Sequence, residues 1–201
     1  MRIHAEKKAL GHGLVVRAGY AFRGSIEEVA AGPVRAVQMK DLDPAAGLDW
    51  DSVVRTQLRG RGTADWLAAD DVLFVARGTR FYAVCLGDAP PGPAVCGPHL
   101  FHLRVKRGHA LLPAFVAWQI NQSPFQRELQ RAAEGSSQLS VRRPVLESLP
   151  IGIPALAHQQ RIVELARFAQ RERLLQLRLL RNRERQFELI ARALAGMSGS
   201  A

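Results

Sequence analysis

Residues 155–195 read ALAHQQRIVELARFAQRERLLQLRLLRNRERQFELIARALA, a run of about 40 residues without glycine or proline. Because glycine and proline are poor helix formers, the run predicts one helix about 60 Å long. Apolar residues recur along it in two rows at multiples of seven, and Leu177 broadens the resulting stripe. The residues expected at a helix–helix contact are Ile162, Ala166, Ala169, Leu177, Leu180, Phe187, Ile190 and Leu194.

A single helix of this length has nothing of its own against which to bury such a stripe, so it needs a partner helix. A coiled coil between two chains provides one. The alternative is that the segment folds back as two antiparallel helices, with Asn182 as the one turn candidate near its centre. Arg173 and Arg183 interrupt the apolar rows.

Upstream of residue 155 the apolar pattern has mostly a period of two, which is typical of strands. Strands are predicted at 14–22, 34–39, 70–76, 81–86 and 100–105, the third and fourth forming a hairpin. Helices are predicted from Pro113 and over 123–133. Val145, Leu146 and residues 149–154 are predicted to be extended, because Pro150 and Pro154 oppose a helix.

These patterns predict an α+β fold with a single domain over 1–154, a long helix for dimerisation over 155–195 that forms a coiled coil, and a flexible tail over 196–201.

The charge of the chain is strongly and unevenly positive. Lys and Arg total 28 against 18 Asp and Glu, giving +10, and 24 of the cations are Arg. Residues 1–100 carry a net charge of +1 and residues 101–201 carry +9. A basic half favours a polyanionic partner, with nucleic acid the first candidate, although a biased genomic base composition also enriches arginine.

No catalytic, metal or cofactor motif is recognisable. The nucleophile elbow GxSxG, the phosphate-binding GxxxxGK[ST] loop and the dinucleotide-binding GxGxxG are absent, as are the adenine methyltransferase tetrapeptide and the nuclease pattern of Asp followed by Glu-x-Lys. His99 and His102 would face opposite sides of a strand, and Asp70-Asp71 suits a turn cap. The sequence therefore predicts binding without catalysis, with no metal and no cofactor.

The expected location is the cytoplasm. Cys85 and Cys96 lie in apolar surroundings without a CxxC pair, which favours buried thiols in a reducing compartment. The first residues lack the apolar core of a signal peptide, and no run of about 18 apolar residues predicts a membrane span.

Four sequence segments, taken in order, carry a resemblance. They are LAADDVLFVARG at 67–78, PHLFHLR at 98–104 with LPAFVAWQIN at 112–121, GSSQLSV at 135–141, and LESLPIGIPALAHQQRI at 146–162. In this order, with the long helix behind them, they resemble the DNA specificity subunit of type I restriction-modification systems. The resemblance runs from about Gly13 to Ala193.

Two departures from that family stand out. Its members commonly carry two target recognition domains and two long helices, whereas this chain has one of each and is similar to a half-subunit. The acidic residue usual before Gln159 is replaced by His158.

The resemblance implies a protein that does no chemistry but directs methyltransferase subunits, and through them a restriction subunit, to a split DNA sequence for adenine methylation and phage defence. Two copies joined through 155–195 would rebuild the two-domain form. A two-fold homodimer would then read a split palindrome, because equal subunits read equal half-sites.

Residue chemistry suggests where double-stranded DNA would be bound. Arg77 and Arg80 flank a glycine in a tight turn, where a guanidinium can reach guanine O6 and N7. Glutamine can pair with adenine, and arginines in loops suit phosphates. The candidates are Arg23, Lys40, Arg59, Arg61, Arg77, Arg80, Ser137, Gln138, Ser140, Arg142 and Arg143. Each can instead be a solvated surface residue, and Gln138 can serve only to organise its loop.

Two further questions stay open at this point. The nine arginines among residues 161–192 suit the outer face of a coiled coil or a docking surface for the methyltransferase subunit better than a track for DNA. The second class of function is a regulator or decoy that binds methyltransferase subunits without specific DNA reading. Only the first class, the DNA specificity subunit, requires site-selective binding to DNA.

Overall fold

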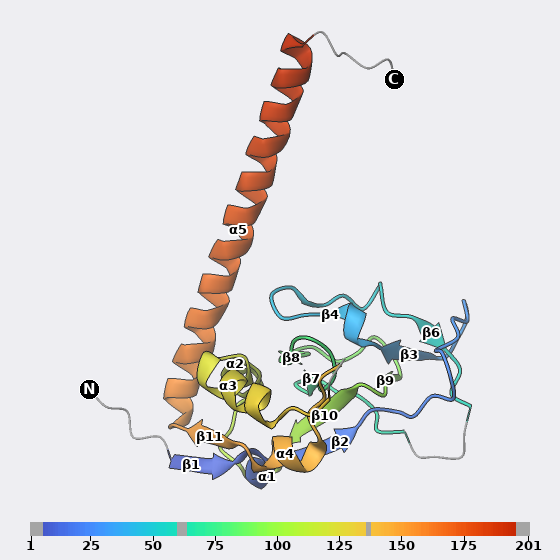
Figure 1. Cartoon of the computed structure of the whole chain (residues 1–201). Helices are drawn as coiled ribbons and strands as arrows, with labels where there is room; N and C mark the ends of the chain where they lie inside the picture. Colours follow the sequence, from blue (N-terminus) through green and yellow to red (C-terminus); the bar gives the residue numbers. More distant parts are fainter. Residues whose placement is uncertain (1–5, 60–63, 136–137, 196–201) are drawn as a thin grey trace. The chain divides into compact units, whose positions relative to one another are not determined.

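The computed structural model describes residues 6–59, 64–135 and 138–195 of the chain. The chain divides into two compact units, unit 1 (residues 1–163) and unit 2 (residues 164–201). Unit 1 mixes sheets and helices, and the described part of unit 2 is helical (Figure 1). The predicted α+β fold with a long C-terminal helix is therefore confirmed, while the coiled coil stays a prediction.

A four-stranded antiparallel sheet lies at the centre of unit 1. Its strands, in spatial order, are β2 (Leu14–Ala18), β10 (Leu100–Val105), β7 (Val72–Val75) and β8 (Tyr82–Cys85). All four were predicted, and β7 and β8 form the predicted hairpin, with Val72 opposite Cys85.

Both faces of this sheet are covered. Val72 and Phe74 of β7 pack with the helices α2 (Pro113–Ile120) and α3 (Ser123–Ala132). Leu73 and Val75 point into a second hydrophobic cluster on the other face. This double burial explains why β7 reads as an uninterrupted apolar run and not as an alternation.

Short strands build the second cluster. β3 (Val34–Val37) lies between β6 (Arg55–Thr56) and β9 (Ala94–Cys96), antiparallel to the first and parallel to the second. The 3₁₀ turn η1 (Met39–Asp41) leads into a hairpin of β4 (Leu42–Asp43) and β5 (Gly47–Leu48). Figure 1 shows β3, β6 and β9 at the side of unit 1 away from α2 and α3.

The ends of unit 1 are joined in a two-stranded sheet of β1 (Glu6–Ala9) and β11 (Pro150–Ile153), with the short helix α1 (Leu10–Gly13) after β1. The predicted extended conformation of Val145 and Leu146 is wrong, because both lie in α4 (Arg143–Ser148). Pro144 occupies the first turn of α4, where its missing N–H costs no helical hydrogen bond. Pro150 constrains only the residue before it, so the strand begins after the helix has ended.

The long segment forms one continuous helix, α5 (Leu156–Leu194), of 39 residues. Asn182 lies inside it, so the fold-back alternative is wrong. Within the described residues, no helix has both the length and the apolar character needed to cross a membrane.

Gln159 fixes the start of α5 within unit 1. Its side chain is fully buried and all three of its hydrogen bonds go to backbone. Oε1 accepts from the N–H of Leu112 at 2.8 Å, and Nε2 donates to the carbonyls of Ala110 at 2.9 Å and Pro154 at 2.8 Å. One side chain thus ties together the loop before α2, the end of β11 and the first turns of α5.

The two cysteines differ in environment. Cys96 is buried in the second cluster, and this burial raises the pKa of its thiol to about 12. Cys85 is only half-buried, so the prediction that both thiols are buried holds fully for Cys96 alone.

A charged cluster lies inside the apolar sheet. Asp71 is 1% exposed and its carboxylate accepts from Nε and Nη2 of Arg104, at 2.7 and 2.6 Å, and from the N–H of Ala68 at 2.7 Å. Nε2 of the equally buried His102 lies 2.7 Å from Oδ2. Burial by itself would raise the pKa of Asp71, but the hydrogen bonds from Arg104 and Ala68 and the adjacent imidazole of His102 outweigh it and lower the pKa to about 2.

Asp71 is expected to make the stability of unit 1 sensitive to acid. Because its pKa in the folded chain lies below the ordinary value of 3.8, its contribution is complete above pH 4 and is lost as pH falls toward 2. The shift corresponds to about 2 kcal/mol of unfolding free energy. Urea unfolding from pH 7 to pH 2 should show this loss in the natural chain and not in Asp71→Asn, which is already destabilised at pH 7.

Asp70→Asn is the matched control, because Asp70 is exposed and its φ of +63° suits asparagine equally well. A pH profile of Asp71→Asn identical to that of Asp70→Asn would contradict the assignment.

Candidate nucleic-acid interface

The turn between β7 and β8 carries Arg77 and Arg80 on either side of Gly78, whose φ is +129°. Backbone hydrogen bonds hold residues 139–141 along this turn. The N–H of Gly78 donates to the carbonyl of Leu139 at 3.0 Å, and the N–H of Val141 donates to the carbonyl of Ala76 at 2.9 Å. The hairpin turn and residues 139–141 of the segment at 135–143, which the sequence proposed separately as parts of a DNA-binding surface, therefore lie side by side.

Gly135 explains why this segment begins with glycine. Its φ is +121°, and a Cβ at this position would lie 2.4 Å from the carbonyl oxygen of Gln138. The chain then returns so that Ser140 and Glu134 exchange two backbone hydrogen bonds, of 2.9 and 3.0 Å. Gln138 is exposed at this tight turn, while Ser137 lies outside the described residues.

Two arginines of the segment are already ion-paired. Nη2 of Arg142 lies 2.6 Å from Oε2 of Glu134, and Nε of Arg143 lies 3.7 Å from Oε1 of Glu147 along α4. Both arginines are more than half exposed. Exposed pairs of this kind contribute about 0–1 kcal/mol, so each arginine can exchange its carboxylate for a phosphate at small cost.

Arg23 and Arg59 line a cavity of about 630 Å³ whose wall includes Tyr20, Phe22 and Glu27. The rings of Tyr20 and Phe22 meet edge to face with centroids 4.9 Å apart. Arg59 forms a 2.9 Å ion pair with Glu27. Arg61 lies outside the described residues.

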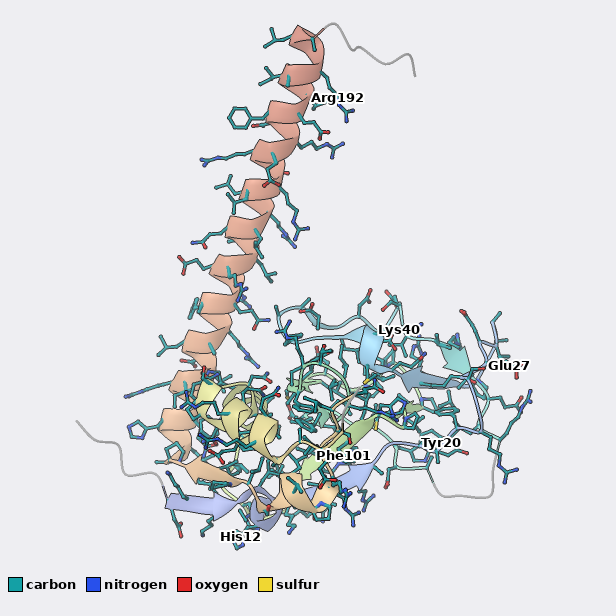
Figure 2. The ribbon with its side chains drawn as sticks, in the orientation of Figure 1. His12, Tyr20, Glu27, Lys40, Phe101 and Arg192 are labelled. Carbon is teal, nitrogen blue, oxygen red and sulfur yellow. The ribbon has the colours of Figure 1, made fainter. Side chains whose placement is uncertain are left out.

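Lys40 lines a neighbouring depression of about 300 Å³, which shares Ser25 with the first cavity. Figure 2 shows Lys40, Tyr20 and Glu27 on the side of unit 1 that carries β3, β4 and β6. His99 also lines this depression, and its carbonyl accepts from the N–H of Ala76 at 3.1 Å.

The described candidates thus fall into two groups in unit 1. Arg23 and Arg59 line a cavity that adjoins the depression of Lys40, and Arg77 and Arg80 lie at the hairpin turn beside residues 139–141. Within the described residues four cations of these two groups have no ion-pair partner: Arg23, Lys40, Arg77 and Arg80. Exposed, uncompensated cations are suited to binding a polyanion. Whether each residue touches a base or a phosphate stays a prediction.

Several functional positions escaped the sequence analysis. For the aromatic pair Tyr20 and Phe22 beside Arg23, the sequence pattern predicts only a strand. Asp71 was recognised as a turn cap, which the bond from Ala68 confirms, but its role as partner of Arg104 depends on the register of β7 and β10. Among the described residues, no group of three or more His, Cys, Asp or Glu side chains is placed to hold a metal.

No protein-family model matches the sequence, and no curated protein matches it significantly. Solved structures do match the fold. The S subunit of a type I restriction-modification system from M. genitalium superposes with a TM-score of 0.56 at 15% identity, covering 94% of this chain. The HsdS subunit from Thermoanaerobacter tengcongensis gives 0.59 at 15% identity over 87%. A structure described as the basis of complex assembly and conformational transition of the type I R-M system gives 0.59 at 15% over 94%.

The chain spans less than half the length of these structures: 46% of the M. genitalium subunit, 39% of the T. tengcongensis subunit and 43% of the chain in the assembly structure. At this identity the likeness establishes the fold alone: one α+β module followed by one long helix.

Proposed function

We propose that this chain is a DNA specificity subunit of a type I restriction-modification complex that acts as a homodimer of half-subunits. In this role it binds double-stranded DNA in the cytoplasm at a split palindrome. It carries out no reaction itself but places methyltransferase subunits for adenine methylation and, through them, a restriction subunit.

The fold match over nearly the whole chain, at less than half the length of the matched S subunits, is the observation that carries the proposal. The described residues contain one such module. Two copies would bring two modules together, and the exposed apolar stripe of α5 gives them a surface to share.

The two groups of candidate residues support the DNA-binding part of the proposal. Their uncompensated cations supply affinity for phosphates, and the side chains of Arg77, Arg80 and Gln138 have the donors that read base edges in the major groove.

Selection from a random library of double-stranded DNA tests the proposal. The purified chain, at about 50 mM salt to favour phosphate contacts, is expected to enrich two inverted copies of one short sequence at a fixed separation. Static light scattering on the same sample should give a mass near twice 22.1 kDa.

The outcomes separate the two classes of function. Salt-dependent binding without enrichment of any sequence contradicts the specificity role. If such a chain still captured purified type I methyltransferase subunits, the regulator reading would replace it. If a monomer enriched a single half-site, the sequence-specific binding to DNA would stand, but the homodimer on a split palindrome would be contradicted.

A further inference from the structure

Unit 2 exposes a broad apolar surface. Leu165, Phe168, Phe187 and Leu194 are 69%, 66%, 73% and 85% exposed, and Leu175, Leu179, Leu180, Leu189 and Ile190 are each more than half exposed. Figure 2 shows side chains projecting from α5 on all sides, with Arg192 near its end.

At about 100° per residue, these side chains centre on one line along α5. Leu165, Leu179 and Ile190 lie in the line, with Phe168 and Leu175 on one flank and Leu180, Phe187 and Leu194 on the other. We define the seam by the residues spaced three and four apart along this line: Ile162, Leu165, Ala169, Glu172, Gln176, Leu179, Arg183, Gln186, Ile190 and Ala193.

The seam contains two charges of opposite sign, Glu172 and Arg183. Within the described residues Arg183 has no ion pair, and Glu172 is contacted by Nε2 of Gln176 at 3.3 Å. A charge inside a helix–helix contact is tolerated when an opposite charge meets it and is costly when it meets apolar or like-charged groups. The two charges can therefore decide how a partner helix lies.

A second copy of the helix can satisfy both charges in one arrangement. In a parallel pair with equal residues side by side, Arg183 would meet Arg183 of the other copy, and Glu172 would meet Glu172. In an antiparallel pair centred between Leu177 and Arg178, Glu172 of each copy meets Arg183 of the other. The same register sets Leu165 against Ile190, also twice.

Shifting the antiparallel register by one heptad destroys this match. Arg183 would then lie against Leu179 in one direction of shift and against Leu165 in the other. The charge pattern thus complements itself at one register among those that keep the seam in contact.

We propose that Glu172 and Arg183 are the residues that select the partner of α5: a second copy of this chain, antiparallel, with its centre between Leu177 and Arg178. This inference rests on the homodimer proposed above and adds its orientation, its register and the residues that enforce them.

Charge reversal tests the pair. Glu172→Arg and Arg183→Glu are each expected to raise the dimer dissociation constant at least about tenfold in sedimentation equilibrium, because each sets like charges against one another at two places. The double variant restores opposite charges and should return within about threefold of the natural chain. An equimolar mixture of the two single variants should form heterodimers. The matched controls are Glu184→Arg and Arg185→Glu, which reverse exposed charges outside the seam.

Cysteine cross-linking tests the orientation independently. In the antiparallel register, mild oxidation of a mixture of Leu165→Cys and Ile190→Cys chains should give a covalent dimer on a non-reducing gel. Neither variant alone should do so, and the natural chain, whose Cys85 and Cys96 lie in unit 1, provides the blank. A covalent dimer formed by each variant alone would overturn the proposal in favour of parallel pairing.

Failure of the proposed helix pairing can be distinguished from failure of the proposed function. A natural chain that stays monomeric at all concentrations overturns both the homodimer and this register. A dimer whose dissociation constant is changed by neither Glu172→Arg nor Arg183→Glu overturns the register while the homodimer stands. A dimer with the expected cross-links that enriches no DNA sequence supports the register and contradicts the specificity role.

Discussion

Replacing both Arg77 and Arg80 by alanine is expected to reduce the affinity of the chain for its selected DNA about 100-fold. Both guanidinium groups belong to exposed residues at the β7–β8 turn and have no ion-pair partner within the described residues, so no internal rearrangement compensates their loss. A good arginine contact to a base edge is worth about 1–3 kcal/mol, and two contacts of about 1.4 kcal/mol each give this factor. Fluorescence anisotropy with the selected duplex measures the change.

The salt dependence of the same measurement tells which contact is lost. If the arginines bind phosphates, the slope of log affinity against log salt should fall by about 2; if they read bases, the slope should change little and sequence preference should relax. The control is Arg107→Ala/Arg127→Ala, which removes two exposed arginines that belong to neither group of candidate residues. Equal losses in the two double variants would show that only net charge matters and would contradict the placement of the interface.

Gln159→Leu is expected to lower the free energy of unfolding of the chain by about 3 kcal/mol. Leucine fills a similar volume but leaves the N–H of Leu112 and the carbonyls of Ala110 and Pro154 buried without this partner. Orphaned buried polar groups cost about 1–3 kcal/mol each, and partial relaxation reduces their sum. Urea unfolding followed by circular dichroism and by tryptophan fluorescence measures the loss.

Gln160→Leu makes the same chemical change on the exposed side of the same helical turn and should alter stability by less than about 0.5 kcal/mol. If the two variants had equal stability, Gln159 would not be the residue that fixes α5 to unit 1.

Local pattern was sufficient for most of the helices and strands. Pro113 and Ser123-Pro124 begin helices where proline is accepted in the first turn, and the apolar segments at 70–76 and 81–86 pair around a glycine turn. The helix at 143–148 was not predicted, because two prolines act in opposite directions there. Pro150 favours an extended chain before it, whereas Pro144 favours the start of a helix, and the structure follows Pro144.

For the candidate interface, the sequence supplied residue types but not their arrangement. Arg77 and Ser140 are 63 positions apart and become neighbours through a bridge between their backbones. Lys40 comes to line one depression with His99, which lies between β9 and β10 and about 60 positions further along the chain. Such proximity depends on strand register, which is set by long-range packing and carries no local signature.

The sequence by itself determined the unbroken 39-residue helix, because helix formation depends on local propensity and this run lacks every strong breaker. It also determined the hairpin around Gly78, since its turn chemistry is local. Only the tertiary structure decided that Asp71 is held as a carboxylate by Arg104 and His102, and that Gln159 satisfies three backbone groups from separate segments. Buried polar groups need partners from wherever the folded chain brings them, so those roles appear only once the chain has packed.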